Sequence, residues 1–160
     1  MIGAILFHGG FLVGVLVVME IFVCLVHRHV MHGFGWTWHK SHHAGGQGGL
    51  ELNDAYALVF AALTMVVFLV APNRASWIYW LAIGVSLYGV LYAFVHEILV
   101  HRRLAVPIGL RNRYLARLVA AHHLHHAVHD RDGAVSFGFL YAPPLAVLRA
   151  RLRTARQTAP

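Results

Sequence analysis

The chain has 160 residues, of which 59% are hydrophobic and 12% are charged, and its mean hydropathy is +0.62. These values exclude an ordinary soluble globular domain, and the length fits one domain that covers residues 1–160. The net charge of +7 requires no nucleic-acid partner, because basic residues at a membrane surface contact anionic lipid headgroups. The single cysteine excludes an internal disulfide.

Three long apolar runs organise the chain. They cover residues 2–26, 55–71 and 77–95, and the third continues through His96 and Glu97 to residue 100. Each is close to the ~20 residues with which a helix crosses the hydrocarbon core of a bilayer. The first run lacks the charged start and the cleavage site of a signal peptide, so we expect it to be retained. The sequence predicts an all-α integral membrane protein with about three transmembrane helices.

The basic residues predict how these helices are oriented. Of the 13 Lys and Arg residues, only Arg74 lies in the short turn between the second and third runs, and all the others follow the first or third run. By the positive-inside rule those stretches face the cytoplasm, which places the N-terminus outside. Helices expected at about 114–126 and 145–160 are too short or too polar to span, so we expect them along the inner surface.

Histidines form the most distinctive pattern. Residues 27–43 read HRHVMHGFGWTWHKSHH, and HEILVH at 96–101 and HHLHH at 122–126 follow, so that HxxxxH precedes HxxHH in each half of the chain. Neutral imidazole suits iron, copper, zinc and nickel. A metal takes about four to six ligands, so ten histidines predict two metals in a cytoplasmic cap. The ten are His27, His32, His39, His42, His43, His96, His101, His122, His125 and His126.

A single isolated histidine in such a chain is more often a hydrogen-bonded residue at the membrane interface, and a His-rich tract can bind metal loosely. The repeated, dispersed spacing favours an ordered site over both interpretations. The three residues of HxxHH lie at i, i+3 and i+4 on one helix face, so they can converge on one point. The two residues of HxxxxH point about 140° apart on a regular helix. Either the helix ends or bulges between them, or they bind different metals.

Two other polar positions need an explanation. Glu20 lies within the first apolar run, where a carboxylate is costly. It is expected to orient a ligand imidazole, to line a substrate path, or to bond to a neighbouring helix as a protonated acid. Asn53 or Asp54 is predicted to cap the helix of the second run.

Aromatic residues supply candidates for substrate contacts. Tyr88 and Tyr92 lie four residues apart in the third run and either line a pocket or simply pack. The segment SFGFLYAPP, residues 136–144, contains two prolines and is expected to be neither a span nor a helix interior. Its Phe137, Phe139 and Tyr141 either form the mouth through which a lipid-soluble substrate reaches the metals or anchor the segment in the membrane.

Taken in order, HRHVMHGFGWTWHKSHH, NDAYALVFAAL, HEILVHRR, HHLHHAV and VSFGFLYAPP closely resemble the bacterial β-carotene hydroxylases of the membrane di-iron fatty acid hydroxylase superfamily. The resemblance covers about residues 20–153. The histidine pattern alone indicates only the wider group of membrane di-iron hydroxylases and desaturases, whereas VSFGFLYAPP is the more specific part. Glu97 departs from the Asp that these hydroxylases commonly carry.

The resemblance implies hydroxylation of the β-ionone rings of β-carotene at C3, giving β-cryptoxanthin and then zeaxanthin, in a bacterial inner membrane with the active site on the cytoplasmic side. Zinc has no redox chemistry for such a C–H bond, whereas two irons can reduce the co-substrate O2. The chain carries no flavin or nicotinamide fingerprint, so electrons are expected from an external carrier, ferredoxin or a similar protein. The carotenoid is expected to enter from the lipid bilayer.

The resemblance also implies roles for single residues. The ten histidines are expected to bind iron, and no catalytic residue beyond these ligands is expected. His29 and His123 are adjacent spares that could replace a ligand, and His8 is expected to be structural. The residues expected to support the ligands from behind are Glu20, Glu97 and His129; those expected at the substrate are Phe137, Phe139, Tyr141, Tyr88 and Tyr92.

Rival functions remain at this point. A ketolase that oxidises C4 of the same ring and a fatty acid or sterol hydroxylase share the superfamily. A non-enzymatic metal-binding membrane protein would also account for the number of histidines. Such a protein predicts loosely held, exchangeable metal and no oxygen consumption.

Overall fold

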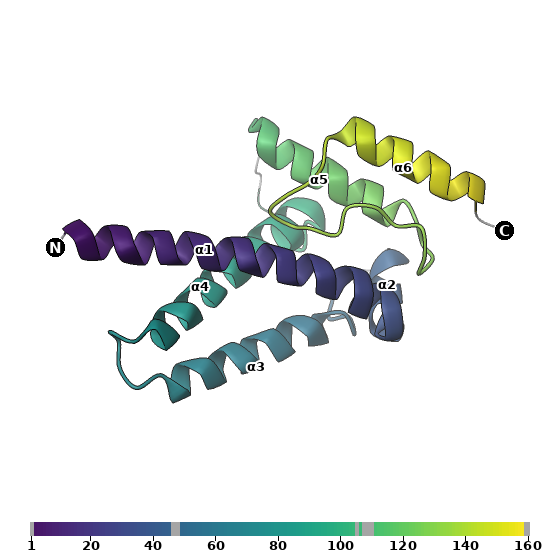
Figure 1. The fold of residues 1–160 in the computed structure, drawn as a ribbon. Helices are drawn as coiled ribbons and strands as arrows, with labels where there is room; N and C mark the ends of the chain where they lie inside the picture. Colours follow the sequence, from purple (N-terminus) through teal and green to yellow (C-terminus); the bar gives the residue numbers. More distant parts are fainter. Residues whose placement is uncertain (1, 46–48, 105, 107–110, 159–160) are drawn as a thin grey trace.

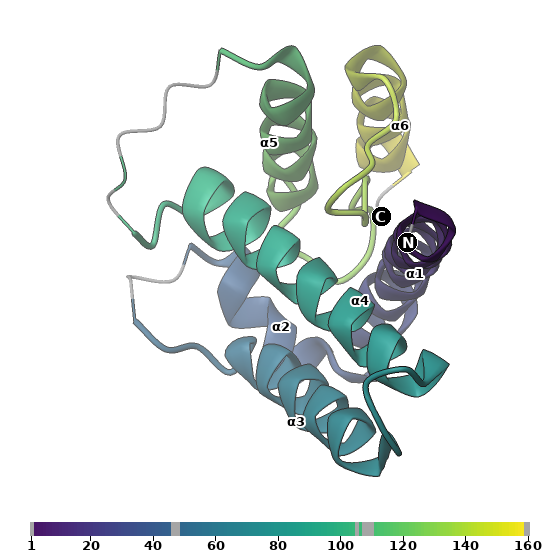
Figure 2. The same ribbon diagram turned by 90° about the vertical axis from the view of Figure 1, so that its left-hand side faces the viewer.

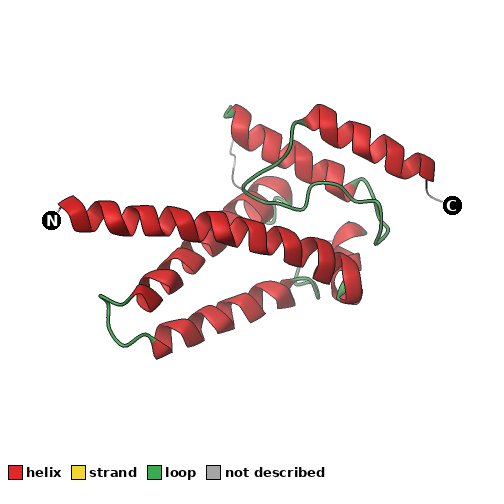
Figure 3. Ribbon diagram, viewed as in Figure 1, coloured by secondary structure: helices red, strands yellow, loops and turns green. Residues whose placement is uncertain are grey.

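The structure is a computed structural model that describes residues 2–45, 49–104, 106 and 111–158. Over these residues the chain is helical, with no strand (Figure 3). Six α-helices and two π-helical segments follow one another: α1 (Ile2–Val26), η1 (His27–Phe34), α2 (Trp36–His43), α3 (Asp54–Val70), α4 (Trp77–Tyr92), η2 (Ala93–Val100), α5 (Arg113–His126) and α6 (Leu145–Thr158).

The long apolar helices α1, α3 and α4 form one end of the molecule. In Figure 1 the N-terminal end of α1 and the α3–α4 turn lie on the same side, and α2 lies at the opposite end. Helix α4 contacts both α1 and α3. At the α1–α4 contact, Val15 is the one buried residue of α1, and it packs against Gly84. The small residue lets the two helices approach closely.

These helices expose apolar side chains rather than burying them. The segment Ile2–Phe34 and the segment Trp77–Val100 are each long and apolar enough to cross a membrane. Helix α3 is also apolar, with 17 residues, and has no buried residue. Large exposed apolar surfaces mark contact with a membrane or a partner.

The conventional hydrophobic core lies at the other end, between η2, α5, α6 and the segment before α6. Figure 2 shows α5 and α6 side by side on one side of α4 and η2. Leu148 of α6 is fully buried there, together with Leu118 and Ala121 of α5. Asn112 begins α5, because its side-chain oxygen accepts hydrogen bonds from the backbone N–H groups of Tyr114 and Leu115.

The predicted helices agree with these bounds to within about two residues, and residues 136–144 are non-helical as expected until α6 begins. Asn53, one of the two predicted caps, occupies the N-cap position of α3. Its side chain makes no capping bond. The amide oxygen of Asn53 instead lies 2.7 Å from Nδ1 of His39. It accepts a hydrogen bond from this imidazole and not from the first N–H groups of the helix.

Candidate metal centre

The fold brings ten buried or half-buried histidines together in two groups. Within each group the ligand atoms lie within 4.8 Å of one another. The first group consists of His27, His32, His39, His43 and His125, and the second of His42, His96, His101, His122 and His126. Each group takes residues from both halves of the chain. The sequence-predicted set of ten is therefore assembled at one place, at the ends of the long apolar helices.

Two π-helical segments explain how the HxxxxH pairs work. In a π-helix the hydrogen bonds run between residues five apart, which adds residues to a turn and brings i and i+5 to a similar direction. The N–H of His101 donates such a bond to the carbonyl of His96, at 3.0 Å. Segments η1 and η2 thus place His27 with His32, and His96 with His101, in the same group. Of the alternatives left open by the sequence, the bulged helix is found at both positions.

The three residues of each HxxHH could have converged on one point, but the folded chain divides them between the two groups. His39 and His43 belong to the first group, whereas His42 belongs to the second. The same split separates His125 from its two neighbours in α5. Along an α-helix, residue i+4 lies about 40° to one side of residue i, and residue i+3 about 60° to the other. Helices α2 and α5 therefore each contribute histidines to both groups from one side of the helix.

Within each group the Nε2 atoms face one another. The Nε2–Nε2 distances in the first group are 3.2 Å for His27–His39 and 3.0 Å for His43–His125. In the second group His42–His96 is 3.1 Å and His122–His126 is 2.9 Å. Two nitrogens bound to one ion at about 2.1 Å and at right angles are about 3.0 Å apart. The donor set and its spacing therefore fit one metal ion in each group.

Oxygen acceptors behind the imidazoles of the first group fix which nitrogen faces inward. A carbonyl can only accept, so each Nδ1 carries the proton and each Nε2 presents its lone pair to the centre. His27 donates to the Phe137 carbonyl at 3.0 Å, and His39 to the Asn53 amide oxygen at 2.7 Å. The other three donate to the carbonyls of Arg131, Val128 and Val135. All five acceptors are neutral.

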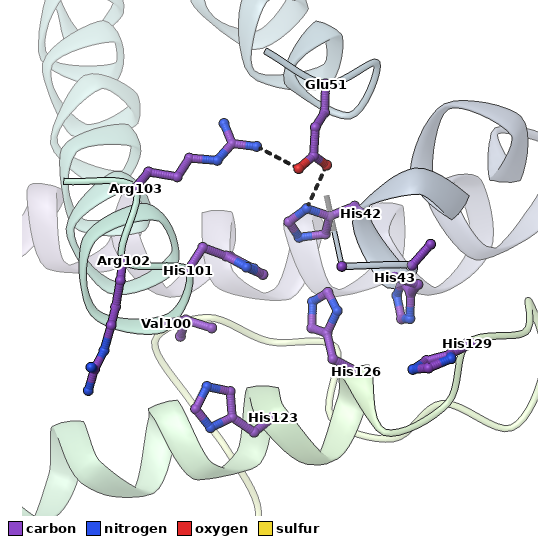
Figure 4. A pocket seen from close by; sticks show the side chains of 12 residues that line it. His42, His43, Glu51, Val100, His101, Arg102, Arg103, His123, His126 and His129 are labelled. Atoms are coloured by element: carbon purple, nitrogen blue, oxygen red, sulfur yellow. Dashed lines mark hydrogen bonds and ion pairs between the residues drawn. The ribbon is translucent and has the colours of Figure 1, made fainter. Parts of the chain in front are cut away.

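The second group is supported by carboxylates. His96 donates through Nδ1 to Glu97 at 2.6 Å, and Nδ1 of His42 lies 3.3 Å from Glu51 (Figure 4). Arg103 contacts both carboxylates, with Nε 3.0 Å from Glu97 and Nη2 3.4 Å from Glu51, and it also pairs with Asp54. Glu97 thus lies where the sequence expects it. Glu51 and Arg103 were missed, because nothing in their local sequence links them to His42.

Burial keeps these imidazoles neutral. The pKa of His39 is lowered to about 3 and the pKa of His43 to about 4, with loss of solvent as the largest cause. In the second group burial lowers the pKa of His101 to about 4 and that of His126 to about 2. Repulsion among the clustered imidazoles adds to this effect at all four residues. At neutral pH the cluster therefore offers the neutral ligands that a metal needs.

An apolar cavity of about 700 Å³ lies between α1, α3 and α4, and its lining includes Tyr92, Glu97 and Phe139, which contact His96 of the second group. Tyr88, Tyr92 and Phe139, three of the five expected substrate residues, line it. Tyr92 stacks on the ring of His96, with centroids 4.9 Å apart. The remaining two lie elsewhere: Phe137 packs against His27 and other rings of the first group, and the side chain of Tyr141 is exposed on the surface.

A second cavity, of about 570 Å³, approaches the histidines with a polar lining (Figure 4). His42, His101 and His126 of the second group border it, together with Arg102 and Arg103. The exposed side chains of His123 and His129 lie on the same cavity and outside both groups.

Two further histidines lie apart from the cluster. The exposed His29 belongs to neither group. His8, near the start of α1, bonds to the Ala4 carbonyl and contacts the ring of Trp80.

The carboxylate of Glu20 binds backbone N–H groups and a tyrosine hydroxyl, and its hydrogen bonds in the described chain include none to a histidine. Its hydrogen bonds in the described chain come from the backbone N–H groups of Phe139, Leu140 and Tyr141 and from the hydroxyl of Tyr88. Glu20 therefore ties the segment before α6 to α1 and α4. The sequence marks Glu20 as unusual, yet its partners lie 68 to 121 residues away and leave no local signal.

Comparison with known proteins supplies the family. The chain is 47% identical over 135 residues to a β-carotene hydroxylase of Pantoea ananas, covering 84% of this chain and 77% of that protein. It is 46% identical over 142 residues to a β-carotene hydroxylase of a Paracoccus species, covering 88% of each. A chloroplastic β-carotene 3-hydroxylase of Arabidopsis thaliana is 34% identical over 135 residues, which cover 82% of this chain and 44% of that protein. Neither a protein-family profile nor a solved structure matches the chain. With such identity over most of its length and of the bacterial relatives' length, the chain belongs to the β-carotene hydroxylase family.

Proposed function

We propose that this protein hydroxylates the β-ionone rings of β-carotene at C3, giving β-cryptoxanthin and then zeaxanthin, at a di-iron centre that uses O2. The observation that carries the proposal is an apolar cavity whose wall residue Phe139 contacts His27 and His96, one member of each group of five histidines. Relatives named β-carotene hydroxylase support the substrate. The plant relatives named β-carotene 3-hydroxylase support the position.

The ten histidines would hold two iron ions, five for each. Their Nδ1 protons are donated outward to oxygen acceptors in seven cases, so the Nε2 lone pairs are free for iron. When bound, the two irons supply the redox chemistry that activates O2, with one oxygen atom going to the carotenoid and the other to water. The polar cavity beside His101 and His126 would give the centre a path to water and protons.

The apolar cavity suits one end of a C40 hydrocarbon. The lining consists largely of Met, Leu, Val, Phe and Tyr side chains, which exclude water from the ring. The two ends of β-carotene are chemically the same, so both rings would enter the cavity in turn. The substrate approaches from the bilayer, where it dissolves.

We place the protein in a bacterial inner membrane with three crossings, α1, α3 and α4, and with the histidines on the cytoplasmic side. Helix α3 would be about 25 Å long at 1.5 Å per residue, slightly short of a typical hydrocarbon core of about 30 Å. Exposed arginines on α6 would contact anionic headgroups. The same basic side offers a docking surface for an acidic electron carrier such as ferredoxin. Since both metal groups combine the two halves of the chain, residues 1–160 would act as one domain.

The rival functions make different predictions. A C4 ketolase of the same substrate would yield ketolated pigment, and a fatty acid or sterol hydroxylase would leave β-carotene unchanged. A metal-binding protein without activity would consume no oxygen. Ordered oxygen acceptors behind seven imidazoles favour a fixed site over loosely held metal.

Expression in bacteria that make β-carotene tests the proposal, with His42→Ala beside the wild type and pigments separated by chromatography. We expect zeaxanthin from the wild type and unchanged β-carotene from an equally abundant variant. Ketolated pigment would move the reaction to C4. Unchanged β-carotene from both, with iron and electron carriers supplied, would contradict the proposed substrate.

A further inference from the structure

We infer that Glu20 is a positioning residue: its carboxylate holds Phe139 as the end wall of the apolar cavity, and this wall selects the ring carbon that faces the histidines. The inference rests on the proposed function for its substrate. Its structural part, the link from Glu20 to Phe139, depends only on the hydrogen bonds and ring contacts of this chain.

Phe139 occupies the boundary between the cavity and both metal groups. Its side chain lines the cavity and is only 4% exposed. The ring stacks on His27 of the first group, with centroids 5.3 Å apart and planes within 14°. It also contacts His96 of the second group at 5.1 Å and Tyr92 of the cavity at 4.7 Å. A hydrocarbon ring that enters the cavity therefore meets Phe139 next to the metal ligands.

No helix or strand fixes the backbone of Phe139, so its position depends on other contacts. Glu20 provides them from α1. Oε1 accepts hydrogen bonds from the N–H groups of Phe139 and Tyr141, both at 2.9 Å. Oε2 accepts from the N–H of Leu140 at 3.0 Å and from the hydroxyl of Tyr88 at 2.8 Å. Four donors from two distant segments thus converge on one carboxylate.

The neighbouring glycine shows how closely the segment approaches Glu20. A Cβ at Gly138 would lie 2.5 Å from Oε1 of Glu20 and 2.7 Å from the carbonyl of Tyr141. Such distances are shorter than van der Waals contact, so any larger residue would push the segment away from the carboxylate. Glycine at position 138 therefore allows the close approach in which Glu20 accepts the N–H groups of the segment.

Only a carboxylate matches these four donors. An amide at position 20 would turn one acceptor oxygen into an NH2 group that faces two other donors. The lost bonds would release the segment, and Phe139 would move with its backbone. Since C3 and C4 of the ring are adjacent carbons, a shift of the wall by about 1 Å is enough to change which one reacts fastest.

The test compares purified wild type with Glu20→Gln, Gly138→Ala and Phe139→Leu in liposomes that contain β-carotene, supplied with iron, O2 and an electron carrier. Chromatography gives the fraction of product hydroxylated away from the wild-type carbon, and metal analysis gives the iron bound per protein. Matched controls are Asp132→Asn, an exposed carboxylate, and Phe7→Leu, an exposed phenylalanine of α1.

We expect the off-position fraction to rise at least tenfold in all three variants, with a larger change in KM than in bound iron, and to stay constant in both controls. Phe139→Leu tests the wall even if the Glu20→Gln protein does not accumulate. This substitution leaves the backbone N–H of residue 139 and its hydrogen bond to Glu20 in place. Wild-type regiochemistry and KM in Phe139→Leu and Gly138→Ala would overturn the inference.

A measurement without turnover separates this inference from the proposed function. Bound β-carotene in a fixed, chiral pocket gives an induced circular dichroism band. We expect that band to change in Phe139→Leu and Gly138→Ala and to remain in the controls. If the wild type binds β-carotene but does not hydroxylate it, the proposed function fails while the band still decides the role of Phe139. An unchanged band in both variants would contradict the wall.

Discussion

The imidazole of His96 donates through Nδ1 to the carboxylate of Glu97 at 2.6 Å, the shortest of the seven contacts between an oxygen and a ligand-group Nδ1. The two residues are adjacent in η2, and Arg103 holds the other carboxylate oxygen at 3.0 Å. A carboxylate that accepts the Nδ1 hydrogen bond makes Nε2 of the imidazole a stronger electron donor to a metal than a backbone carbonyl does. The second group of histidines therefore differs electronically from the first, whose acceptors are neutral.

Removing this charge should weaken one metal site selectively. For Glu97→Gln we expect metal affinity in the second group to fall about 10- to 100-fold, because the amide orients His96 less strongly and carries no charge. Competition with a chelator, followed by metal analysis, measures the change. Asp132→Asn removes an exposed carboxylate and should have no effect. Equal metal affinity in Glu97→Gln and wild type would contradict a role for this pair.

Histidine deletions should depend on group membership rather than on sequence neighbourhood. His42→Ala removes one imidazole of the second group, and under the proposed function we expect bound iron to fall from about two per chain toward one. His29→Ala is the matched control, because His29 is exposed and belongs to neither group. Metal analysis of both purified variants measures the iron bound per chain. Equal losses in the two variants would show that the grouping is wrong.

The contact between α1 and α4 predicts opposite effects for two glycines of one helix. A Cβ at Gly84 would lie 2.6 Å from Val15, whereas a Cβ at Gly89 would meet nothing within 4 Å. Gly84→Ala should lower the free energy of unfolding by about 1–3 kcal/mol through overpacking. Gly89→Ala should raise it by about 0.5–1 kcal/mol, because alanine is the better helix former. Unfolding in detergent compares the two, and destabilisation of similar size would argue against this packing.

Metal removal should destabilise the helices that meet at the cluster. The first group joins η1 and α2 to α5, and the second joins α2 to η2 and α5, so metal bound there would favour the folded arrangement over the unfolded chain. Treatment with a chelator should lower the melting temperature, and added iron should restore it. A melting temperature that does not respond to either step would contradict metal ions as cross-links between these helices.

The spacing of the histidines predicted the members of the cluster but not their grouping. All ten were identifiable, because HxxxxH and HxxHH recur in both halves of the chain. Which group His42 or His125 joins depends on how helices α2 and α5 face each other across the centre, and this is a property of packing. The π-helical turns at His27 and His96 were one of two possibilities on the sequence, and hydrogen bonding in the folded chain selects them.

The long helices were predictable because each is a long apolar run with few polar interruptions. The supporting contacts were not, because their partners are distant in sequence. Asn53 looked like a helix cap and instead accepts from His39, 14 residues earlier. Glu20 looked like a polar residue with a function, but its contacts with Phe139 and Tyr88 exist only in the folded chain.

Isotope labelling tests the central claim most directly. Purified wild-type protein loaded with iron would be given β-carotene, an electron carrier and ¹⁸O2 in ordinary water, and the product would be analysed by mass spectrometry. The proposed function predicts zeaxanthin with ¹⁸O in each of its ring hydroxyl groups, at C3. Hydroxyl groups that carry oxygen from water, or β-carotene recovered unchanged while iron is bound, would contradict it.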